Sequence, residues 1–396
     1  MLPTPYTRPD RAAAAAPLRV ELVTRDDDFA ALRAPWDALL RDSRSDCFFL
    51  TWEWLHAWWT HLRDRFTLNL ILVWDGDDLV GIAPLARTRT SFLWLSRLEF
   101  LGTGFAGSDY LDVIIQRDRE REIARTISDA LVASNLALHL DHLPPASVAA
   151  SMLVDRIAAD EWIAMHAEVG TCPYIPLAGH SWDSYLANLG SAHRANVRRR
   201  LRGLEREFDV RFARVTTDEA RRDALATLMG LHNRRWDERG GSTAFSTPAC
   251  RAFHADVTRR ALDRGWLRLY ELRLNDAVAA ATYCFSYNGR VCFYQGAFDD
   301  RYQQHSVGMV AMGLTIRAAI EERAHEFDML YGVESYKWLW AQHARELHRL
   351  DLFPAGLAGR IHHGTVRAER AARSLVRRII PRRSCVSNTR PAGGVC

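Results

Sequence analysis

The sequence predicts an α/β protein made of two similar halves, each a mixed, mostly antiparallel sheet flanked by helices. One order of elements occurs twice, at a separation of about 190 residues: a strand, two helices, a meander, a helix, a strand and a helix. The chain has 396 residues, more than one ordinary hydrophobic core accommodates, so two domains are expected. A hydrophobic content of 48% with 25% charged residues is ordinary for a globular protein.

The first half is predicted from short apolar runs and helical patterns separated by turn residues. Its hairpin turns at Asp75-Gly76-Asp77, and the tryptophans of its second helix cover two sides and are expected in the core. The expected elements are a strand at 18–23, helices around 28–41 and 51–63, the hairpin at 68–88, a strand at 94–102, a helix at 119–133, a strand at 136–143 and a helix at 147–159.

The second half carries clearer local signals. Thr247-Pro248 is a good helix start, with a capping hydroxyl and proline at the first position. Asn288-Gly289 is the strongest short-range hairpin signal. The expected elements are a strand at 210–215, helices at 218–238 and 247–264, strands at 266–274, 278–287 and 290–298, a helix at 306–323, a strand at 327–332, a helix over 335–342 and a strand at 347–353.

Composition shifts suggest the domain boundaries. We expect a disordered leader at 1–17, a first domain at 18–172, a second at 173–358 and a basic tail at 359–396. The tail, from Arg360 on, has nine arginines and one acid, Glu369, which leaves the rest of the chain with a net charge of −4. The net acidic body argues against nucleic acid as a partner. The tail is expected to be a solvated terminus or to contact an anionic partner such as a membrane surface.

Cysteine usage and hydropathy bear on location. The chain has seven cysteines with no C-x-x-C pair, which favours reduced thiols in the cytoplasm. No segment reaches the roughly 18 apolar residues of a membrane span. We therefore expect a cytoplasmic protein, with peripheral contact at the inner face of the membrane as an option for the tail.

Five segments together resemble a known family. They are "FFLTWEWLHAWW" (48–59), "SAHRANVRRRLRGLE" (191–205), "LHNRRW" (231–236), "GAFDDRYQQHSVG" (296–308) and "FDMLYGVESYKWLW" (327–340). Their order across nearly the whole chain resembles GNAT N-acyltransferases of the tandem CelD-like group and, more distantly, the Fem-type aminoacyl transferases. The resemblance implies two tandem GNAT-like domains.

The resemblance also implies an activity. It is transfer of an acetyl or longer acyl group from acyl-CoA to an amine or hydroxyl acceptor, with a cell-envelope or exopolysaccharide precursor as the favoured acceptor. Acyl-CoA would be the co-substrate, and no histidine has metal-ligand spacing, so no metal is expected. Two alternatives stay open: an aminoacyl-tRNA donor, as in Fem-type enzymes, and a non-catalytic binding module of polysaccharide machinery.

The cofactor turn is expected at Gln303-Gln304-His305-Ser306-Val307-Gly308. In GNAT enzymes the sequence Q/R-x-x-G-x-G/A lets backbone N–H groups close on a pyrophosphate at a helix start. Gln303 and Gly308 match, while Ser306 replaces the first glycine and is also a good helix cap. The alternative is a plain cap followed by a packing glycine. The first half has only "GTGFAGSDY" (102–110), which lacks the spacing, so one working donor site is expected.

Acyl transfer needs a proton acceptor, donors for the oxyanion and a proton donor for the thiolate. The resemblance makes Tyr336 the proton donor, although it could equally pack beside Trp338. Glu334 could accept the nucleophile's proton, or be a helix-start carboxylate. Asp299 could orient the acceptor, or simply end its strand. Backbone N–H groups of 294–298 would hold the oxyanion.

Lys337 is the only lysine among the 52 basic residues. The resemblance places such a lysine facing a donor or acceptor phosphate, where a flexible point charge suits better than a planar guanidinium. Chance survival is the alternative.

The last candidates are basic and aromatic. The helix at 193–207 has an apolar stripe with arginines outward, which could guide an anionic acceptor or a CoA phosphate. Arg235 and Trp236 could line the acceptor cleft, with core packing as likely a role for Trp236 as substrate stacking.

Overall fold

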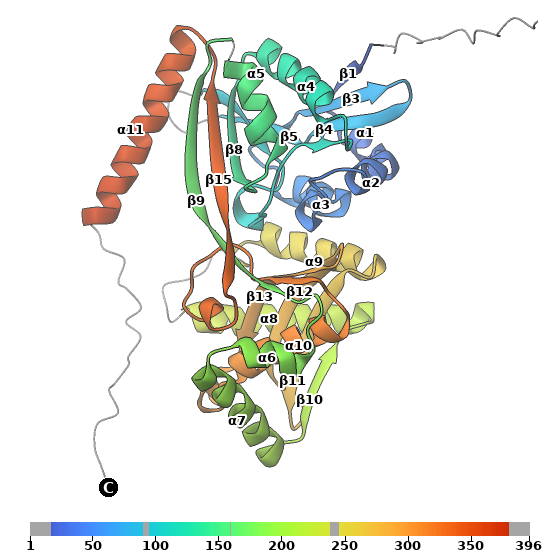
Figure 1. Ribbon diagram of the computed structural model, residues 1–396, viewed down its shortest axis with the longest axis vertical. Coiled ribbons are helices and arrows are strands. Elements are labelled where there is room, and N and C mark those ends of the chain that lie inside the picture. The colour runs from blue at the N-terminus through green and yellow to red at the C-terminus, as the bar shows by residue number, and fades with distance from the viewer. Residues whose placement is uncertain (1–16, 90–94, 159, 238–244, 380–396) are drawn as a thin grey trace, which may run out of the picture.

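The computed structural model describes residues 17–89, 95–158, 160–237 and 245–379 (Figure 1). Two halves are stacked along the long axis, and two long strands, β9 and β15, run between them. The predicted leader at 1–17 lies almost entirely outside the described residues.

The first half contains most of the predicted elements in the predicted order. Its elements are β1 (Arg19–Val23), α1 (Asp26–Ala31), α2 (Arg33–Arg41), α3 (Trp52–Leu62), β2 (Thr67–Leu68), β3 (Leu70–Asp75), β4 (Asp78–Ala83), β5 (Leu85–Arg89), β6 (Ser96–Phe100), β7 (Ile114–Ile115), α4 (Glu120–Ser134), β8 (Ala137–Leu143) and α5 (Val154–Ala158).

The second half follows the same order after two extra helices. Its elements are β9 (Ile163–Pro176), α6 (Trp182–Asn188), α7 (Ser191–Glu207), β10 (Val210–Arg214), α8 (Asp218–Asp237), α9 (Pro248–Asp263), β11 (Leu267–Leu274), β12 (Ala277–Tyr287), β13 (Arg290–Phe298), α10 (Val307–Glu321), β14 (Glu326–Asp328), β15 (His343–Phe353) and α11 (Leu357–Ile379). Thr247 caps α9 as predicted, accepting from the N–H of Cys250.

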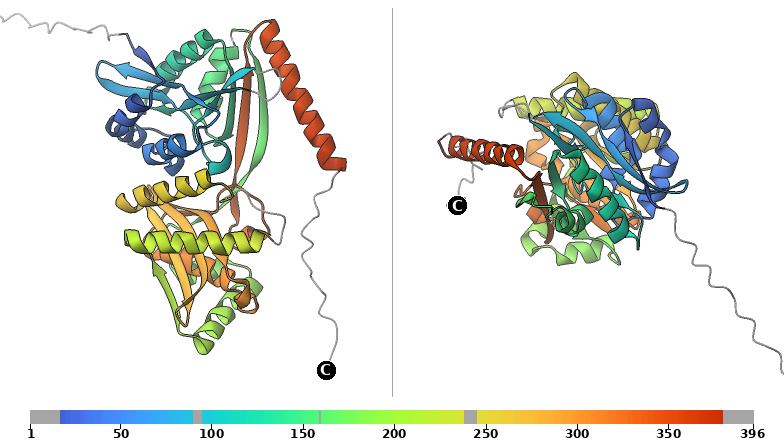
Figure 2. Two further views of the ribbon diagram at one scale, coloured as in Figure 1. Left: turned by 180° about the vertical axis from the view of Figure 1, so that it is seen from behind. Right: turned by 90° about the horizontal axis from the view of Figure 1, so that it is seen from above.

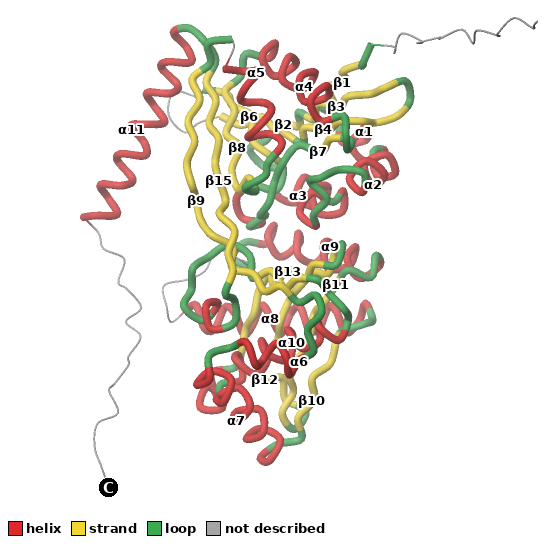
Figure 3. Tube along the Cα trace, viewed as in Figure 1, coloured by secondary structure: helices red, strands yellow, loops and turns green. Residues whose placement is uncertain are grey.

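The internal repeat is visible in the strand pairing. β6 and β8 run parallel, with Arg97 opposite Ala137, and β13 and β14 run parallel, with Arg290 opposite Glu326. A helix joins the strands in each case, α4 in the first half and α10 in the second. Among the described strands the other pairings are antiparallel. The predicted fold, two GNAT-like halves with mixed sheets and flanking helices, is confirmed (Figure 3).

One large sheet passes through both halves. Its strand order is β10-β11-β12-β13-β14-β9-β15-β8-β6-β5-β2, and a second sheet has the order β1-β3-β4-β7. β9 pairs with β15 along its length and with β14 through residues 174–176. The predicted boundary at 172/173 therefore falls inside a strand. The prolines near this boundary suggest a linker, yet residues 163–168 of β9 alternate between half-buried and exposed, as a strand does. The domain limits themselves stay a prediction.

Helices cover both faces of the second-half sheet. The Thr282 hydroxyl of β12 lies 2.8 Å from that of Thr315 on α10. The next residue, Tyr283, has its ring centroid 5.9 Å from that of His254 on α9. Successive strand residues point to opposite faces, so α10 and α9 lie on opposite sides of β12.

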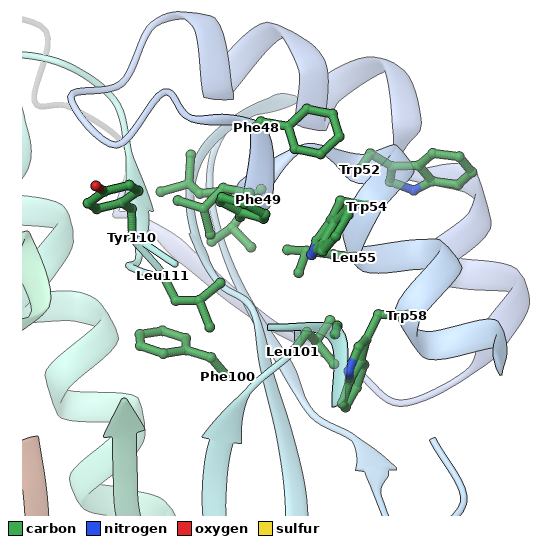
Figure 4. Close-up of a cluster of buried hydrophobic side chains, with 14 of the residues drawn as sticks. Phe48, Phe49, Trp52, Trp54, Leu55, Trp58, Phe100, Leu101, Tyr110 and Leu111 are labelled. Carbon is green, nitrogen blue, oxygen red and sulfur yellow. The ribbon is translucent and has the colours of Figure 1, made fainter. Parts of the chain in front are cut away.

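The hydrophobic core is continuous between the halves. The aromatic residues of α3 and the turn before it are buried together (Figure 4). Phe48 stacks on Phe285 of β12 at 4.0 Å between ring centroids, and Trp54 meets Phe253 of α9 edge-on at 5.0 Å. The predicted core role of the α3 tryptophans is confirmed, and this packing holds the two halves against each other.

The C-terminal part departs from prediction in three places. β14 ends at Asp328, before the predicted limit of 332, because Leu330 and Gly332 have positive φ angles that end a strand. The helix expected over 335–342 is a single 3-10 turn, Lys337–Leu339. The tail expected as a solvated terminus at 359–396 is helical as far as Ile379, because α11 (Leu357–Ile379) includes its first part. None of the helices in the described ranges is long and apolar enough to cross a membrane.

Candidate functional site

The predicted cofactor turn connects β13 to α10. A 3-10 turn follows β13, and Ser306 then takes a left-handed conformation, with φ 56° and ψ 39°, before α10 begins at Val307. The prediction that Ser306 caps the helix is wrong, since its side chain makes no cap hydrogen bond; capping needs an extended backbone at that position. The N–H groups of Val307 and Gly308 belong to the first turn, which has no intrahelical acceptors. Gly308 is partly exposed and Val307 is fully buried, so an anion at the positive end of α10 reaches the N–H of Gly308 directly and that of Val307 only if the turn moves.

Gly308 brings this turn close to the sheet. A Cβ added at Gly308 would lie 2.7 Å from Cδ1 of Phe298, the last residue of β13. The close approach to Phe298 therefore supports the packing role considered for Gly308. The same contact fixes the start of α10 against the end of β13, which is where a donor spanning both elements would bind.

The arginine-rich helix α7 lies beside the turn. Arg200 donates from Nη1 to the carbonyl of Gln304 at 2.7 Å, and its Nε is buried without a hydrogen-bond partner among the described residues. His305 lies 3.5 Å from Glu207 of the same helix. Gln303 and Gln304 are exposed. The start of α10 thus has a guanidinium next to its free N–H groups, and both favour a phosphate.

The parallel strands β13 and β14 separate beside this turn. They pair only from Arg290 to Cys292, opposite Glu326 to Asp328. The register of β13 against β12 then shifts, so that Tyr294 is an extra residue between Phe293 and Gln295. A bulge at such a point bends the strand and re-aims its backbone groups. Along residues 293–298, the described part of the chain offers β13 no second strand on its β14 side.

A segment of the first half spans this opening. The Tyr294 hydroxyl donates to the Ala106 carbonyl at 2.7 Å. The Tyr110 hydroxyl donates to Asp328 at the end of β14, also at 2.7 Å. Residues 106–110 therefore contact both separating strands. This is the "GTGFAGSDY" segment, for which no donor-binding role was expected.

The buried acid near the end of β14 is Asp328. Burial raises the pKa of Asp328 to about 6, against the opposing effect of the hydrogen bond from Tyr110. Glu334 was expected at the strand end, but it lies in the following loop with 56% of its side chain exposed. Sequence reasoning missed Asp328 because the strand was expected to continue past it.

Lys337 is buried and holds this loop. Its Nζ donates to the carbonyls of Leu330 and Tyr331 at 3.1 and 2.8 Å and lies 3.1 Å from Glu334. These three acceptors match the three donors of an ammonium group. A compact ammonium suits such closely spaced acceptors better than a planar guanidinium, which is a physical reason for a lysine in a chain that otherwise uses arginine.

Tyr336 belongs to an exposed apolar rim on the same loop. Its ring is 42% exposed, next to Trp338 and Leu339 at 44% and 49%. Trp340, by contrast, is buried and packs over Gly313 of α10, where a Cβ would lie 3.0 Å from its ring. Tyr336 therefore lies largely outside the core, and its role as proton donor stays a prediction.

Asp299 ends β13 and starts the 3-10 turn. It accepts from the N–H of Arg301 at 2.9 Å and forms a two-pronged ion pair with the Arg301 guanidinium. The hydrogen bond from that guanidinium lowers the pKa of Asp299. These contacts match the strand-ending alternative for Asp299.

Arg235 and Trp236 lie near the end of α8, and their side chains are outside the described residues. One turn earlier, His232 is buried with its Nδ1 2.6 Å from Nε2 of Gln295. This helix end therefore lies next to the bulge of β13, and predicted acceptor residues and the predicted oxyanion segment are neighbours.

An Asp–His pair lies where the two halves meet. Asp109 Oδ1 is 2.7 Å from Nδ1 of His142, and Asp109 Oδ2 accepts from the N–H of Tyr331 at 2.8 Å. Burial lowers the pKa of His142, but the hydrogen bond and charge of Asp109 outweigh it, so the pKa is raised. The imidazole is partly exposed and has its centroid 5.2 Å from the Tyr331 ring.

Sequence reasoning missed this pair because its members are far apart in the sequence. One signal was available: His142 is the next-to-last residue of the strand predicted at 136–143, and Asp109 is the next-to-last residue of the glycine-rich segment 102–110. His142 also has φ 58°, a conformation uncommon outside glycine. Within the described ranges no group of three or more His, Cys, Asp or Glu side chains could hold a metal ion.

Comparisons with known proteins agree with this geometry. A family model described as the acetyltransferase (GNAT) domain matches residues 191–338, the range that contains β13, α10 and β14. FemX is similar over 84% of this chain and 96% of its own, at 10% identity and a TM-score of 0.59. L-PGS from Bacillus licheniformis is similar over 88% and 96%, at 12% identity and a TM-score of 0.51.

A conserved protein of unknown function from Bacteroides thetaiotaomicron VPI-5482 is similar over 84% of this chain and 99% of its own, at 12% identity and a TM-score of 0.52. No curated protein matches the sequence. At these identities the likeness is one of fold. Residues 191–338 therefore match the GNAT acetyltransferase family model, and the chain shares its fold with FemX and L-PGS.

Proposed function

We propose that this chain transfers an acetyl or longer acyl group from acyl-CoA to an amine or hydroxyl acceptor. The observation that carries the proposal is the separation of β13 from β14 directly beside the start of α10. In this proposal, backbone N–H groups at the start of α10 would face a phosphate, and those of β13 would face a carbonyl oxygen, within one site. It lies within the matched GNAT domain.

The donor would be held by groups of the second half. The N–H groups of Val307 and Gly308, with Arg200 and Gln303 beside them, would bind the pyrophosphate of CoA. Backbone N–H groups of β13 beyond Cys292 would stabilise the oxyanion. Acyl-CoA would supply the activated thioester, and CoA would leave as the thiol.

His142 is the best-placed proton acceptor. Because Asp109 faces Nδ1, the proton of a neutral imidazole stays on Nδ1 and the lone pair is on Nε2. In the transfer, the acceptor nitrogen or oxygen would bond to the acyl carbon and lose its proton to Nε2 while the C–S bond breaks. The leaving thiolate would take a proton from Tyr336, which stays a prediction. Glu334 is the second candidate for the base.

The acceptor would bind between the two halves, at the loop that follows β14. The rim of Val333, Tyr336, Trp338 and Leu339 is exposed there, and an aromatic rim suits a sugar or an aliphatic chain. A cell-envelope or exopolysaccharide precursor in the cytoplasm remains the proposed class, by resemblance alone.

The similarity to FemX favours one alternative, an aminoacyl-tRNA donor. The arginines of α7 next to the cofactor turn are compatible with either donor. A binding module without catalysis is the third option. The three candidate functions differ in which ligand the protein binds and in whether it catalyses a reaction.

Calorimetry of the full chain with acetyl-CoA and longer acyl-CoAs tests the donor. A Gly308→Trp change would clash with Phe298, so the better variant is Arg200→Glu. It should weaken acetyl-CoA binding about tenfold or more by removing a charged contact. Arg317→Glu, an exposed arginine near the other end of α10, is the matched control and should bind normally. Absence of binding to every acyl-CoA, with binding of aminoacyl-tRNA, would overturn the proposal in favour of the Fem-type donor.

A further inference from the structure

The C-terminal helix α11 leaves the body of the protein. Figure 2 shows it projecting to one side, away from the stacked halves. It is attached at its start, where His362, Thr365 and Val366 are buried, and the His362 ring lies 5.4 Å from Phe353 of β15. One arginine, Arg370, also pairs with Asp351.

A second face of α11 is apolar and exposed. Leu357 and Ile361 are 76% and 46% exposed, and Gly364 and Ala368 continue the line at helical spacing, also exposed. In the sequence the same spacing reaches Leu375. Side chains four and seven positions apart share one helix face, so this is a stripe beside the packed one.

Arginines flank this apolar stripe. Arg360 and Arg367 are exposed, and the seven-residue spacing puts them on one side of the helix next to Gly364. From Arg360 on, the sequence has nine arginines and one acid, while the rest of the chain is net acidic. An apolar face bordered by arginines is the pattern of a helix that lies in a membrane interface.

We propose that α11 docks on the surface of an anionic lipid bilayer. Leu357 and Ile361 would enter the headgroup region, and Arg360 and Arg367 would contact lipid phosphates. A second copy of the chain fits less well, because two strongly cationic segments would repel each other across the contact. Nucleic acid would satisfy the arginines and leave the apolar stripe in water. Because the apolar stripe is short, the proposed membrane binding needs the arginines as well as the apolar side chains.

Sedimentation of the full-length protein with vesicles tests the proposal. Vesicles of phosphatidylcholine with phosphatidylglycerol should bind the protein, and phosphatidylcholine alone should not. Binding should weaken as salt rises, since surface charge is screened. The pair Arg360→Glu and Arg367→Glu should reduce partitioning about 30-fold or more. The pair Leu357→Glu and Ile361→Glu should also abolish it.

Arg121→Glu with Arg125→Glu is the matched control, because both are exposed arginines on α4 in the first half. It should bind vesicles normally. Equal binding to neutral vesicles, no binding to either kind, or loss in the control would overturn the proposal. So would light scattering that shows a dimer abolished by Ile361→Glu. These outcomes do not depend on acyl-CoA binding, so the two proposals can fail separately.

Discussion

Replacing Lys337 with methionine should destabilise the protein strongly. The side chain is 5% exposed, and its ammonium donates to two main-chain carbonyls, those of Leu330 and Tyr331. Methionine fills a similar volume but leaves both carbonyls without their donor. A hydrogen bond to a charged group contributes about 1.5–3 kcal/mol, so two of them give about 3–6 kcal/mol. The ion pair with Glu334 adds little, since that carboxylate is half exposed.

Urea denaturation followed by tryptophan fluorescence measures this loss in the free energy of unfolding. Glu334→Gln is the control, and it should cost no more than about 1 kcal/mol. A Lys337→Met protein as stable as the wild type would refute the loop-holding role. If that stable variant also lost acetyl-CoA binding, the phosphate-facing role suggested by resemblance would replace it.

Three further predictions concern packing, pH and the proton acceptor. Gly308→Ala should cost about 1–3 kcal/mol of stability, because the new methyl would meet the Phe298 ring. Adding Phe298→Leu should recover part of this loss. A double-mutant cycle measured by denaturation checks both effects. Since the pKa of Asp328 is raised from 3.8 to about 6, ionising it opposes folding, so the penalty is absent at pH 3, grows as the pH rises and is complete above about pH 6. The wild type should therefore lose about 3 kcal/mol in the free energy of unfolding between pH 4 and 7, and Asp328→Asn should remove this loss. Denaturation curves measured at a series of pH values check this. The same pH dependence of the unfolding free energy in variant and wild type would contradict it. His142→Gln should lower kcat about 100-fold or more with acetyl-CoA affinity unchanged; Asp109→Asn should act in the same direction, and normal turnover in His142→Gln would assign the base elsewhere.

Local signals predicted most of the second half. The Asn288-Gly289 turn, the Thr247 cap and the three strands within 266–298 depend on neighbours in the sequence, and the structure has all of them where they were expected. The repeat was also predictable, because Arg290 follows Arg97 by 193 residues and Glu326 follows Ala137 by 189 in equivalent pairs. These features need no knowledge of tertiary contacts.

The features that sequence reasoning missed depend on contacts between residues distant in the sequence. β9 is a strand because β14 and β15 pair with it, although its prolines resemble a linker. The burial of Asp328 follows from Tyr110 of the other half, 218 residues away. Asp109 and His142, both in the first half, are 33 residues apart in the sequence and meet only in the folded structure. The isolated lysine was correctly singled out by composition, while its hydrogen-bond partners depended on a loop that sequence reasoning expected to be strand and helix.

Hydrogen–deuterium exchange of the full chain with and without acetyl-CoA tests the central claim most directly. Our account predicts slower amide exchange at 303–310 and along 293–298, where the donor would contact the start of α10 and the bulged part of β13. Residues 210–214 of β10, at the far edge of the sheet, should exchange equally in both samples. Protection confined to the first half, or no protection at 303–310 at saturating acetyl-CoA, would contradict it.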